Sequence, residues 1–505
     1  MRDSFRSLLI GLLKGAILTA CGLSFWPYLA AAGIKGQTGD YSHVFVIPLI
    51  AAVVYLRSER AADTAVRPGV AGALLACGLL LRGLGEWQGW LLVAEAAFPL
   101  LFIGFTELLF GHGQARRVTF PALFMLFGFG FVTDVLRKLF VNYLMLVSAG
   151  AAYDAATTFL PGHGPYIVAQ NMIIVPPDLR FDVIEACAGI RGMLALFVIG
   201  SVLGYARKLN GRQAVRFLFL LTVAGLTINL VRIAATIVFS LLLREHFSHQ
   251  AVHDTMNWVV FGPLILLIPV MVRRAQTGRF RIGLIGGLAM VMILAHAGQW
   301  HMRAAQGNAR LLVRQTQGAE PQVTLEVDQQ GLPRALLPYT SPEVNGKRHW
   351  RWVLTSAMVH GNILHLVVNV SLLLLLGHAI KRDLGPLWVT GVLLAGQIVG
   401  TLVGGWTLAP PPGMTSIVFT GASCAISGLF GAYLVAHLLA KQKWLQAPVF
   451  LALYVAGLWL SAGRLAGMHQ LSFSSHLSGL LAGGLLGIVH TLRARQLGKI
   501  AATQP

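Results

Sequence analysis

The chain has 505 residues, of which 56% are hydrophobic and only 11% are charged. Together with a mean hydropathy of +0.69, this composition excludes a soluble globular protein and predicts a polytopic membrane protein. The net charge of +20 is expected to lie in loops on the cytoplasmic side of a membrane rather than on a nucleic-acid-binding surface. Four cysteines, two of them inside apolar runs, do not suggest a disulfide scaffold.

Apolar windows predict an all-α protein with about 14 membrane-spanning helices. The first apolar run lacks an Ala-x-Ala-like end, so we expect an uncleaved first helix rather than a signal peptide. Residues 134–160 are apolar but carry interrupting charges, which predicts a re-entrant or interfacial helix, or a hairpin of two short spans. The predicted helices cover 8–33, 43–56, 69–82, 89–110, 119–133, 187–205, 217–243, 257–273, 283–298, 360–380, 387–407, 419–440, 448–465 and 476–493.

The distribution of Lys and Arg predicts how these helices are oriented. With the N-terminus in the cytoplasm, the basic clusters fall in cytoplasmic segments along the whole chain, as the positive-inside rule requires. Almost all polar motifs then lie on the outer side. The longest polar stretch, 299–350, contains an alternating run at 322–327 that could form a strand, and we interpret this stretch as the connection between two domains.

The first polar motif, Glu185-Ala-Cys-Ala-Gly-Ile-Arg-Gly192, stands at the mouth of an apolar helix. Cys187 is the candidate nucleophile, because its small neighbours let a substrate backbone approach closely. A thiol needs thiolate character to attack a carbonyl, which a nearby cation and a histidine supply. One candidate is Arg232, inside an apolar helix, where an arginine is costly unless it is paired or faces a wet cavity and is therefore a functional hypothesis by default. The other is His253, a residue type suited to proton transfer.

Each of these three residues also has an ordinary structural interpretation, as a packing thiol, a snorkelling arginine and a loop histidine. Taken singly, those interpretations would be favoured, but the three residues together on the outer half favour a site. Arg232 is expected about 11 residues before the outer end of its helix, or about 16 Å. A broken or tilted helix, or a funnel that admits water, is therefore required.

Four motifs between about residue 10 and residue 275 occur together, namely Asp40-Tyr-Ser-His-Val-Phe-Val-Ile-Pro48, Glu-x-Cys-x-Gly-Ile-Arg at 185–191, Asn229-x-x-Arg-Ile233, and His253 followed by an acidic residue. This set resembles the exosortase/archaeosortase family, membrane-embedded cysteine enzymes that process proteins carrying a short C-terminal sorting tail. The resemblance implies Cys187 as the nucleophile, Arg232 as its cationic partner and His253 as the acid/base. Ser42 and His43, on the outer side, are expected to support substrate binding.

A second constellation lies in the last third of the chain. Ser423 and His476 each open an apolar window on the predicted outer side. A serine hydroxyl is a poor nucleophile until a base removes its proton, so a Ser–His pair at one membrane depth is the minimum catalytic unit. Gly479 and Gly483 share a helix face, which allows another helix to come close enough for this pair to touch.

A third polar motif, His360-Gly-Asn-Ile-Leu-His-Leu-Val-Val-Asn369, precedes this pair. His365 and Asn369 are four residues apart on one helix face, so both side chains could point at one developing oxyanion. His360 lies near the same face, closer to the outer end. Ordinary membrane packing would explain any one of these motifs, but it does not explain three of them in this order.

The order and spacing resemble the rhomboid family of intramembrane serine proteases over about 283–493, with Trp350-Arg351-Trp352 as part of the first outer loop. The resemblance implies Ser423 as the nucleophile and His476 as the base. It also implies that His365 and Asn369 form the oxyanion hole, with His360 as a supporting residue. Cys424 stands where the family commonly has glycine, which puts the substrate range in doubt more than catalysis.

The predicted architecture is thus an exosortase-like helical bundle followed by a six-helix rhomboid-like bundle. The expected enzyme cleaves C-terminal sorting tails of exported proteins, with or without transfer to an acceptor, and also performs intramembrane proteolysis. The expected domains are 1–280 for the exosortase-like domain, 281–345 for the first rhomboid-like helix and outer loop, 346–495 for the protease core and 496–505 for a cytoplasmic tail.

Such an enzyme is expected in a bacterial cytoplasmic membrane, among its lipids, with both sites facing the periplasm or outside. No metal or organic cofactor is implied, because the histidines lack a convincing ligand cluster and no glycine-rich phosphate loop occurs. Three alternatives remain open: a non-catalytic scaffold that binds membrane tails, a chain in which only one site is active, and a transporter, although we find no inverted repeat.

Overall fold

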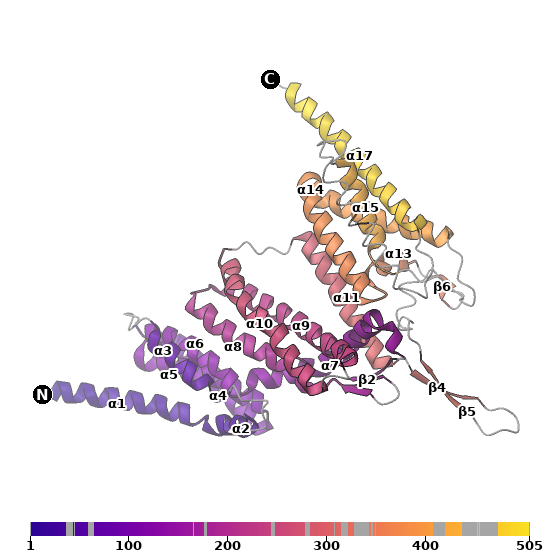
Figure 1. The fold of residues 1–505 in the computed structure, drawn as a ribbon. Helices are drawn as coiled ribbons and strands as arrows, with labels where there is room; N and C mark the ends of the chain where they lie inside the picture. Colours follow the sequence, from indigo (N-terminus) through magenta and orange to yellow (C-terminus); the bar gives the residue numbers. More distant parts are fainter. Residues whose placement is uncertain are drawn as a thin grey trace. The chain divides into compact units, whose positions relative to one another are not determined.

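The structure is a computed structural model, and the chain that it describes is largely helical (Figure 1). The chain divides into two compact units. The first unit contains Met1–Leu144, Ile184–Val231 and Asn257–Phe280, and the second contains Met145–Val183, Arg232–Met256 and Arg281–Pro505. The described residues are 2–36, 44, 46–58, 65–164, 166–175, 179–243, 248–277, 283–307, 309–314, 322–327, 343–344, 347–348, 350–407, 420–436, 452, 454 and 473–503.

Helices dominate because a long apolar helix satisfies its backbone N–H and C=O groups internally, as a lipid environment demands. Among the described residues, nine helices are long and apolar enough to cross a membrane, and three apolar helices are shorter. The predicted polytopic membrane protein is confirmed, whereas the count of about 14 spans stays a prediction. The helices are α1 (Arg2–Leu23), α2 (Trp26–Gly36), α3 (Ile47–Arg57), α4 (Pro68–Gln88), α5 (Leu91–Phe110), α6 (His112–Gly128), α7 (Phe131–Phe159), α8 (Ile190–Ala206), α9 (Gly211–Leu242), α10 (His249–Gln276), α11 (Leu284–Gln306), α13 (Trp352–Thr355), α14 (Ile363–Thr407), α15 (Ser423–Val435) and α17 (Phe473–Thr503), with 3-10 turns at Pro161–His163 (η2), Glu185–Cys187 (η3) and Ser356–Met358 (η5).

Residues 134–159 lie in one unbroken helix. Because α7 runs without interruption from Phe131 to Phe159, the predicted alternative of a hairpin of two short spans is wrong. Asp134 falls in the first turn of α7, where the helix dipole favours a negative side chain, so this charge does not break the helix. α7 is also one of the nine helices that are apolar enough to span a membrane.

Short antiparallel strands complete the described chain. The sheet β1 (Ile167–Ala169), β2 (Met172–Val175), β3 (Leu179–Asp182) follows α7, and the sequence did not predict it. The strand expected at 322–327 is present as β5 (Gln322–Val327), which pairs with β4 (Ala309–Arg314). The remaining strands are β6 (Glu343–Val344) and β7 (Lys347–Arg348).

In the first unit, glycines bring α4 and α5 close together. A Cβ atom at Gly85 would lie 2.5 Å from the backbone nitrogen of Ala94, and one at Gly78 would lie 2.7 Å from the side chain of Leu101. Gly89, with φ of 67°, ends α4 in the left-handed conformation that allows a tight turn into α5. Small residues at a helix interface thus provide the close packing that holds membrane helices together.

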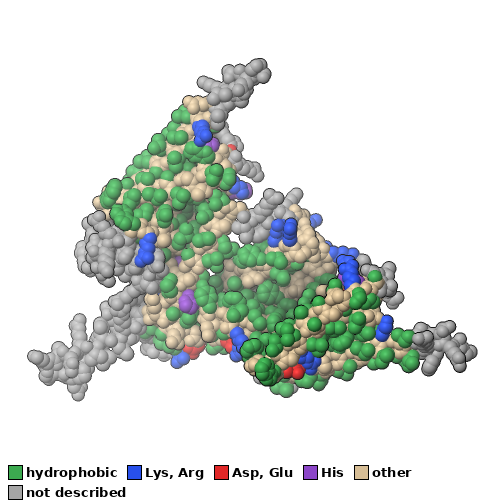
Figure 2. All heavy atoms as spheres, turned by 180° about the vertical axis from the view of Figure 1, so that it is seen from behind, with side chains coloured by type: hydrophobic (Ala, Val, Ile, Leu, Met, Phe, Trp, Pro, Cys, Tyr) green, Lys and Arg blue, Asp and Glu red, His purple; other side chains and the backbone are tan. Residues whose placement is uncertain are grey.

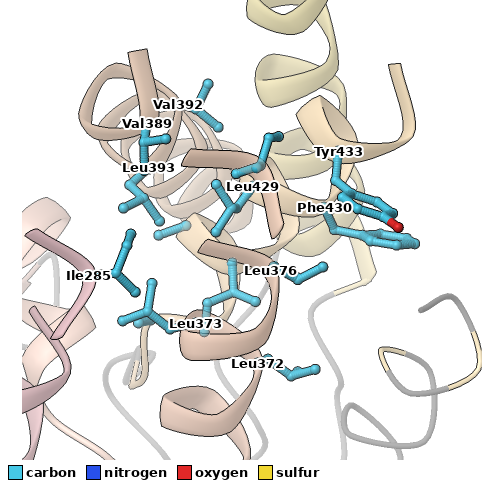
Figure 3. Close-up of a cluster of buried hydrophobic side chains, with 14 of the residues drawn as sticks. Ile285, Leu372, Leu373, Leu376, Val389, Val392, Leu393, Leu429, Phe430 and Tyr433 are labelled. Carbon is cyan, nitrogen blue, oxygen red and sulfur yellow. The ribbon is translucent and has the colours of Figure 1, made fainter. Parts of the chain in front are cut away.

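In the second unit, α11, α14 and α15 pack around one apolar cluster (Figure 3). α14 is kinked at Gly385, which has φ of 75° and is followed by a proline that lacks the N–H a helix needs. This kink separates the two predicted windows 360–380 and 387–407. The labelled members of the cluster are Ile285, Leu372, Leu373, Leu376, Val389, Val392, Leu393, Leu429, Phe430 and Tyr433.

Large apolar side chains also cover much of the described surface, as the face in Figure 2 shows. Leu387 is 86% exposed, Trp406 81% and Leu266 78%. In water such exposure would be unfavourable over so large an area. Lipid tails are as apolar as these side chains, so the surface suits a chain that is embedded in a membrane.

Candidate active sites

Gly421 forms the turn that leads into α15. Its φ of 92° lies in the left-handed region that favours glycine, and its N–H donates to the carbonyl oxygen of Val359 at 2.6 Å. A Cβ atom at this position would lie 2.5 Å from His365 Cε1 and 2.9 Å from Asn369 Nδ2. The structure therefore places His365 and Asn369 directly against the turn that ends at Ser423.

The described residues around His365 and Asn369 do not use all the hydrogen-bonding capacity of these two side chains. His365 and Asn369 are 7% and 2% exposed, and among the described residues neither His365 Nδ1 nor Asn369 Nδ2 has a hydrogen-bond partner. The backbone N–H of His365, in contrast, donates to Asn362 Oδ1 at 2.9 Å, which caps the start of α14. Unpaired polar atoms are costly in a structural core, whereas a site for a developing anion requires such donors.

Close packing of α15 against α17 brings Ser423 and His476 to the same end of the helix pair. Ser423 begins α15 and is buried, and His476 lies in the first turns of α17 and is half-buried. Gly479 of α17 is so close to α15 that a Cβ atom there would lie 2.6 Å from the carbonyl oxygen of Cys424. The close approach that the sequence predicted for Gly479 is confirmed.

The side chain of Cys424 packs on a glycine of the neighbouring helix. A Cβ atom at Gly400 of α14 would lie 3.1 Å from Cys424 Sγ and 2.7 Å from the carbonyl oxygen of Ser475. Cys424 is 6% exposed, so the absence of a side chain at Gly400 provides the space for a residue larger than glycine. Cys424 and Ser475 are the chain neighbours of Ser423 and His476, so α14 contacts both helix beginnings.

His360 is fixed through its backbone by Gln299, a residue that the sequence analysis did not identify. Gln299 Nε2 donates to the His360 carbonyl oxygen at 2.6 Å, and Gln299 Oε1 accepts the His360 N–H at 3.2 Å. The His360 ring lies edge-on to the His365 ring, with centroids 5.3 Å apart. The predicted helix 283–298 stops one residue before Gln299, whereas α11 continues to Gln306. A polar residue at the end of an apolar helix was the available signal.

The imidazole of His360 lies in the loop before α14 and is fully buried. Burial lowers the pKa of His360 well below its usual value, because a charged ring would lose its hydration, and the neighbouring His365 and His296 add to this lowering. His360 is therefore neutral at neutral pH.

Cys187 lies at the mouth of α8, as predicted. The turn η3 ends at Cys187, and Gly189 follows with φ of 89° at the N-cap of α8. Asn229 of α9 donates from Nδ2 to the Cys187 carbonyl oxygen at 3.0 Å, and a Cβ atom at Gly189 would lie 2.6 Å from the Asn229 carboxamide. Asn229 therefore fixes the cysteine turn. A buried amide in an apolar helix was the signal for this role, which the sequence analysis missed.

The other predicted members of the cysteine site lie in the second unit. Arg232 is 8% exposed and His253 is half-buried, and both belong to Arg232–Met256, whereas Cys187 belongs to the first unit. Their grouping into one site stays a prediction. The predicted supporting residues Ser42 and His43 lie outside the described residues.

Comparison with family models identifies membrane domains in both halves of the chain. Residues 36–270 match the family described as transmembrane exosortase, and residues 347–493 match the rhomboid domain. Both resemblances and the predicted class of membrane protein are confirmed. The two matches together support a role in processing proteins at a membrane.

Curated relatives match the rhomboid region. Rhomboid protease GlpG from Pectobacterium atrosepticum is 31% identical over 144 residues, which are 28% of this chain and 49% of the relative. RHOMBOID-like protein 5 from Arabidopsis thaliana is 31% identical over 147 residues, which are 28% of this chain and 45% of the relative. The chain thus spans less than half the length of each of these relatives. No solved structure matches it significantly.

Proposed function

We propose that this chain, which joins a transmembrane exosortase region to a rhomboid region, is a membrane-embedded protein-processing enzyme with two active sites. The serine site cleaves internal peptide bonds of its substrates within the membrane. The observation that carries it is the turn at Gly421, against which the buried His365 ring and the Asn369 carboxamide lie, two residues before Ser423.

In this proposal Ser423 Oγ attacks the scissile carbonyl carbon while His476 accepts the hydroxyl proton. The carbonyl oxygen becomes an oxyanion, and the side chains of His365 and Asn369 stabilise it with hydrogen bonds. Collapse of the intermediate breaks the peptide C–N bond, and His476 returns the proton to the leaving amine. Water then hydrolyses the acyl-enzyme, with His476 as base, and regenerates Ser423.

At the cysteine site, we assign Cys187 as the nucleophile, Arg232 as the cation that favours its thiolate, and His253 as the acid/base. The exosortase match and the half-exposed position of Cys187 at a helix mouth support this assignment. The substrates are exported proteins with a C-terminal membrane-anchoring sorting tail. Cys187 Sγ would attack the scissile carbonyl carbon and form a thioester, while the peptide C–N bond breaks and His253 protonates the leaving amine of the tail. Water or an acceptor amine would then resolve the thioester and release the Cys187 thiol. Both sites would face the outside of a bacterial cytoplasmic membrane.

The serine site is tested with the full chain in proteoliposomes that contain a single-span substrate protein. A fluorophosphonate probe reports on the nucleophile, and mass spectrometry reports on the cleaved bond. Ser423→Ala is expected to abolish probe labelling and to lower cleavage by at least about 1,000-fold. Ser478→Ala is the matched control, because the Ser478 hydroxyl bonds within its own helix, to the carbonyl oxygen of Ser474 at 2.7 Å.

Labelling and cleavage that persist in Ser423→Ala would contradict the proposed nucleophile. A wild-type chain that binds the substrate helix but neither cleaves it nor reacts with the probe would favour the non-catalytic scaffold instead.

A further inference from the structure

A buried polar cluster connects α7, which belongs to the exosortase match, with α11, the helix that precedes the rhomboid match. Asp154 Oδ2 accepts a hydrogen bond from Trp300 Nε1 at 2.8 Å and lies 3.1 Å from His296 Nε2. Asp154 is 1% exposed and His296 0%. The two helices approach closely because Gly150 leaves no room for a Cβ atom against the Trp300 carbonyl.

The hydrogen-bond directions determine where the protons of this cluster lie. Because Gln299 Nε2 donates to the His360 carbonyl oxygen, Gln299 Oε1 is the atom that lies 3.1 Å from His296 Nδ1. An amide oxygen only accepts, so His296 Nδ1 carries a hydrogen. His296 Nε2 then either donates to the Asp154 carboxylate or accepts from its carboxyl group. In both arrangements the pair has no net charge, as a buried pair requires.

An unbroken series of contacts runs from this pair to the serine site. His296 bonds to Gln299, Gln299 holds the backbone of His360 with two hydrogen bonds, and the His360 ring contacts the His365 ring. His365 in turn lies against the turn at Gly421. Each contact joins a fully or nearly fully buried residue to the next. Because a closely packed interior leaves little free space, a displacement of one of these side chains also displaces its neighbour in the series.

We propose that Asp154 and His296 are positioning residues of the serine site, so that a residue of the exosortase region sets the geometry of rhomboid catalysis. Asp154 holds the His296 ring, His296 fixes the rotamer of Gln299, and Gln299 fixes the loop that carries His360. This inference rests on the proposed serine-protease function. Because Asp154 lies outside the rhomboid match, the proposal means that joining the two regions in one chain affects catalysis at the serine site.

The test compares Asp154→Asn with wild type in the proteoliposome assay. Asn preserves size but removes the charge, so the buried His296 ring beside it is neutral. With its hydrogen on Nδ1, His296 then needs a donor at Nε2, whereas Trp300 Nε1 needs an acceptor at the same place, and no single amide atom is both. We expect kcat to fall about 10- to 100-fold with KM within about 2-fold, because catalytic geometry is lost while substrate binding is kept. Thr157→Val is the matched control on α7, since the Thr157 hydroxyl bonds to the carbonyl oxygen of Tyr153 within the helix.

A double variant separates positioning from simple destabilisation. If Asp154 acts through Gln299, then Asp154→Asn combined with Gln299→Met lowers kcat no further than Gln299→Met alone. Should Asp154→Asn fail to accumulate, Gln299→Met by itself tests the link to His360, because Met fills similar space without either hydrogen bond.

The inference is overturned if Asp154→Asn, or Gln299→Met in its place, retains the kcat of Thr157→Val. It is also overturned if the kcat losses of Asp154→Asn and Gln299→Met add fully in the double variant, or if the loss of kcat is explained by a lower unfolding temperature alone. If wild type shows no Ser423-dependent cleavage, the proposed serine site fails and this inference falls with it. An active wild type with a fully active Asp154→Asn removes the inference but leaves the site.

Discussion

At the scale of single residues, the serine site depends on a position with no side chain. His365 and Asn369 were predictable, because residues four apart share a helix face. The role of Gly421 was not predicted, since only the folded chain shows that this residue has a φ of 92° and lies against those two side chains. Gln299 was missed for the same reason: its two bonds to His360 join residues 61 positions apart.

Gly421→Ala is expected to inactivate the serine site. The left-handed conformation costs a non-glycine residue about 1–2 kcal/mol, and the new methyl group would push against the His365 ring. Cleavage should fall about 100-fold, and the unfolding midpoint in detergent should drop. Gly391→Ala, also in the second unit, is the control, because a Cβ atom added there would have no neighbour within 4 Å. Equal activity of the two variants would contradict the role of this turn.

The buried imidazole of His360 predicts a loss of stability in acid. Its pKa is lowered in the folded state, so below a pH of about 6.5 the unfolded chain binds a proton that the folded chain does not. The stability contribution is complete above that pH and is lost as the pH falls towards the lowered folded-state pKa, by up to about 1.4 kcal/mol per pH unit.

Unfolding midpoints of wild type and His360→Gln between pH 8 and pH 5 measure this effect. Wild type should lose stability more steeply than the variant below about pH 6.5. Parallel curves would contradict the lowered pKa of His360, because they would show that its imidazole binds protons equally in the folded and unfolded states.

At the scale of elements, the apolar windows located the described membrane helices well, because burial in lipid makes hydropathy a strong signal. The failures are short or locally charged segments. Strands β1 to β3 have three or four residues each, too few for an alternating pattern to be distinguished from a loop. The charges near the start of α7 suggested an interruption that one continuous helix does not contain.

The contact of α15 with α17 leads to a prediction about neighbouring glycines. Gly483 leaves no room for a Cβ atom against the Gly428 carbonyl, whereas a Cβ atom at Gly484 would meet its nearest neighbour at 3.8 Å. Gly483→Ala should therefore separate the helices, cost about 1–3 kcal/mol and reduce Ser423-dependent cleavage. Gly484→Ala adds the same methyl group and should be tolerated. Unfolding in detergent and cleavage assays of Gly483→Ala and Gly484→Ala test this prediction. Equal stability of the two variants would contradict the close packing of α15 against α17.

At the scale of the whole molecule, the fusion of two membrane regions was readable from motif order, and the family matches confirm it. Local motifs identify a region because they need few residues at fixed spacing. They do not show that Met145–Val183 belongs to the same compact unit as Arg281–Pro505. The Asp154 cluster depends on that long-range packing, so no local pattern in the sequence indicates it.

The proposed function requires two independent nucleophiles in one chain. The most direct measurement is mass spectrometry of the C-termini of surface proteins from cells that carry wild type, Cys187→Ala or Ser423→Ala at equal membrane abundance, with Cys77→Ala and Ser478→Ala as controls. Each nucleophile variant is expected to lose processed C-termini that both controls retain. Unchanged C-termini in both nucleophile variants would contradict the assignment of this chain as a protein-processing enzyme.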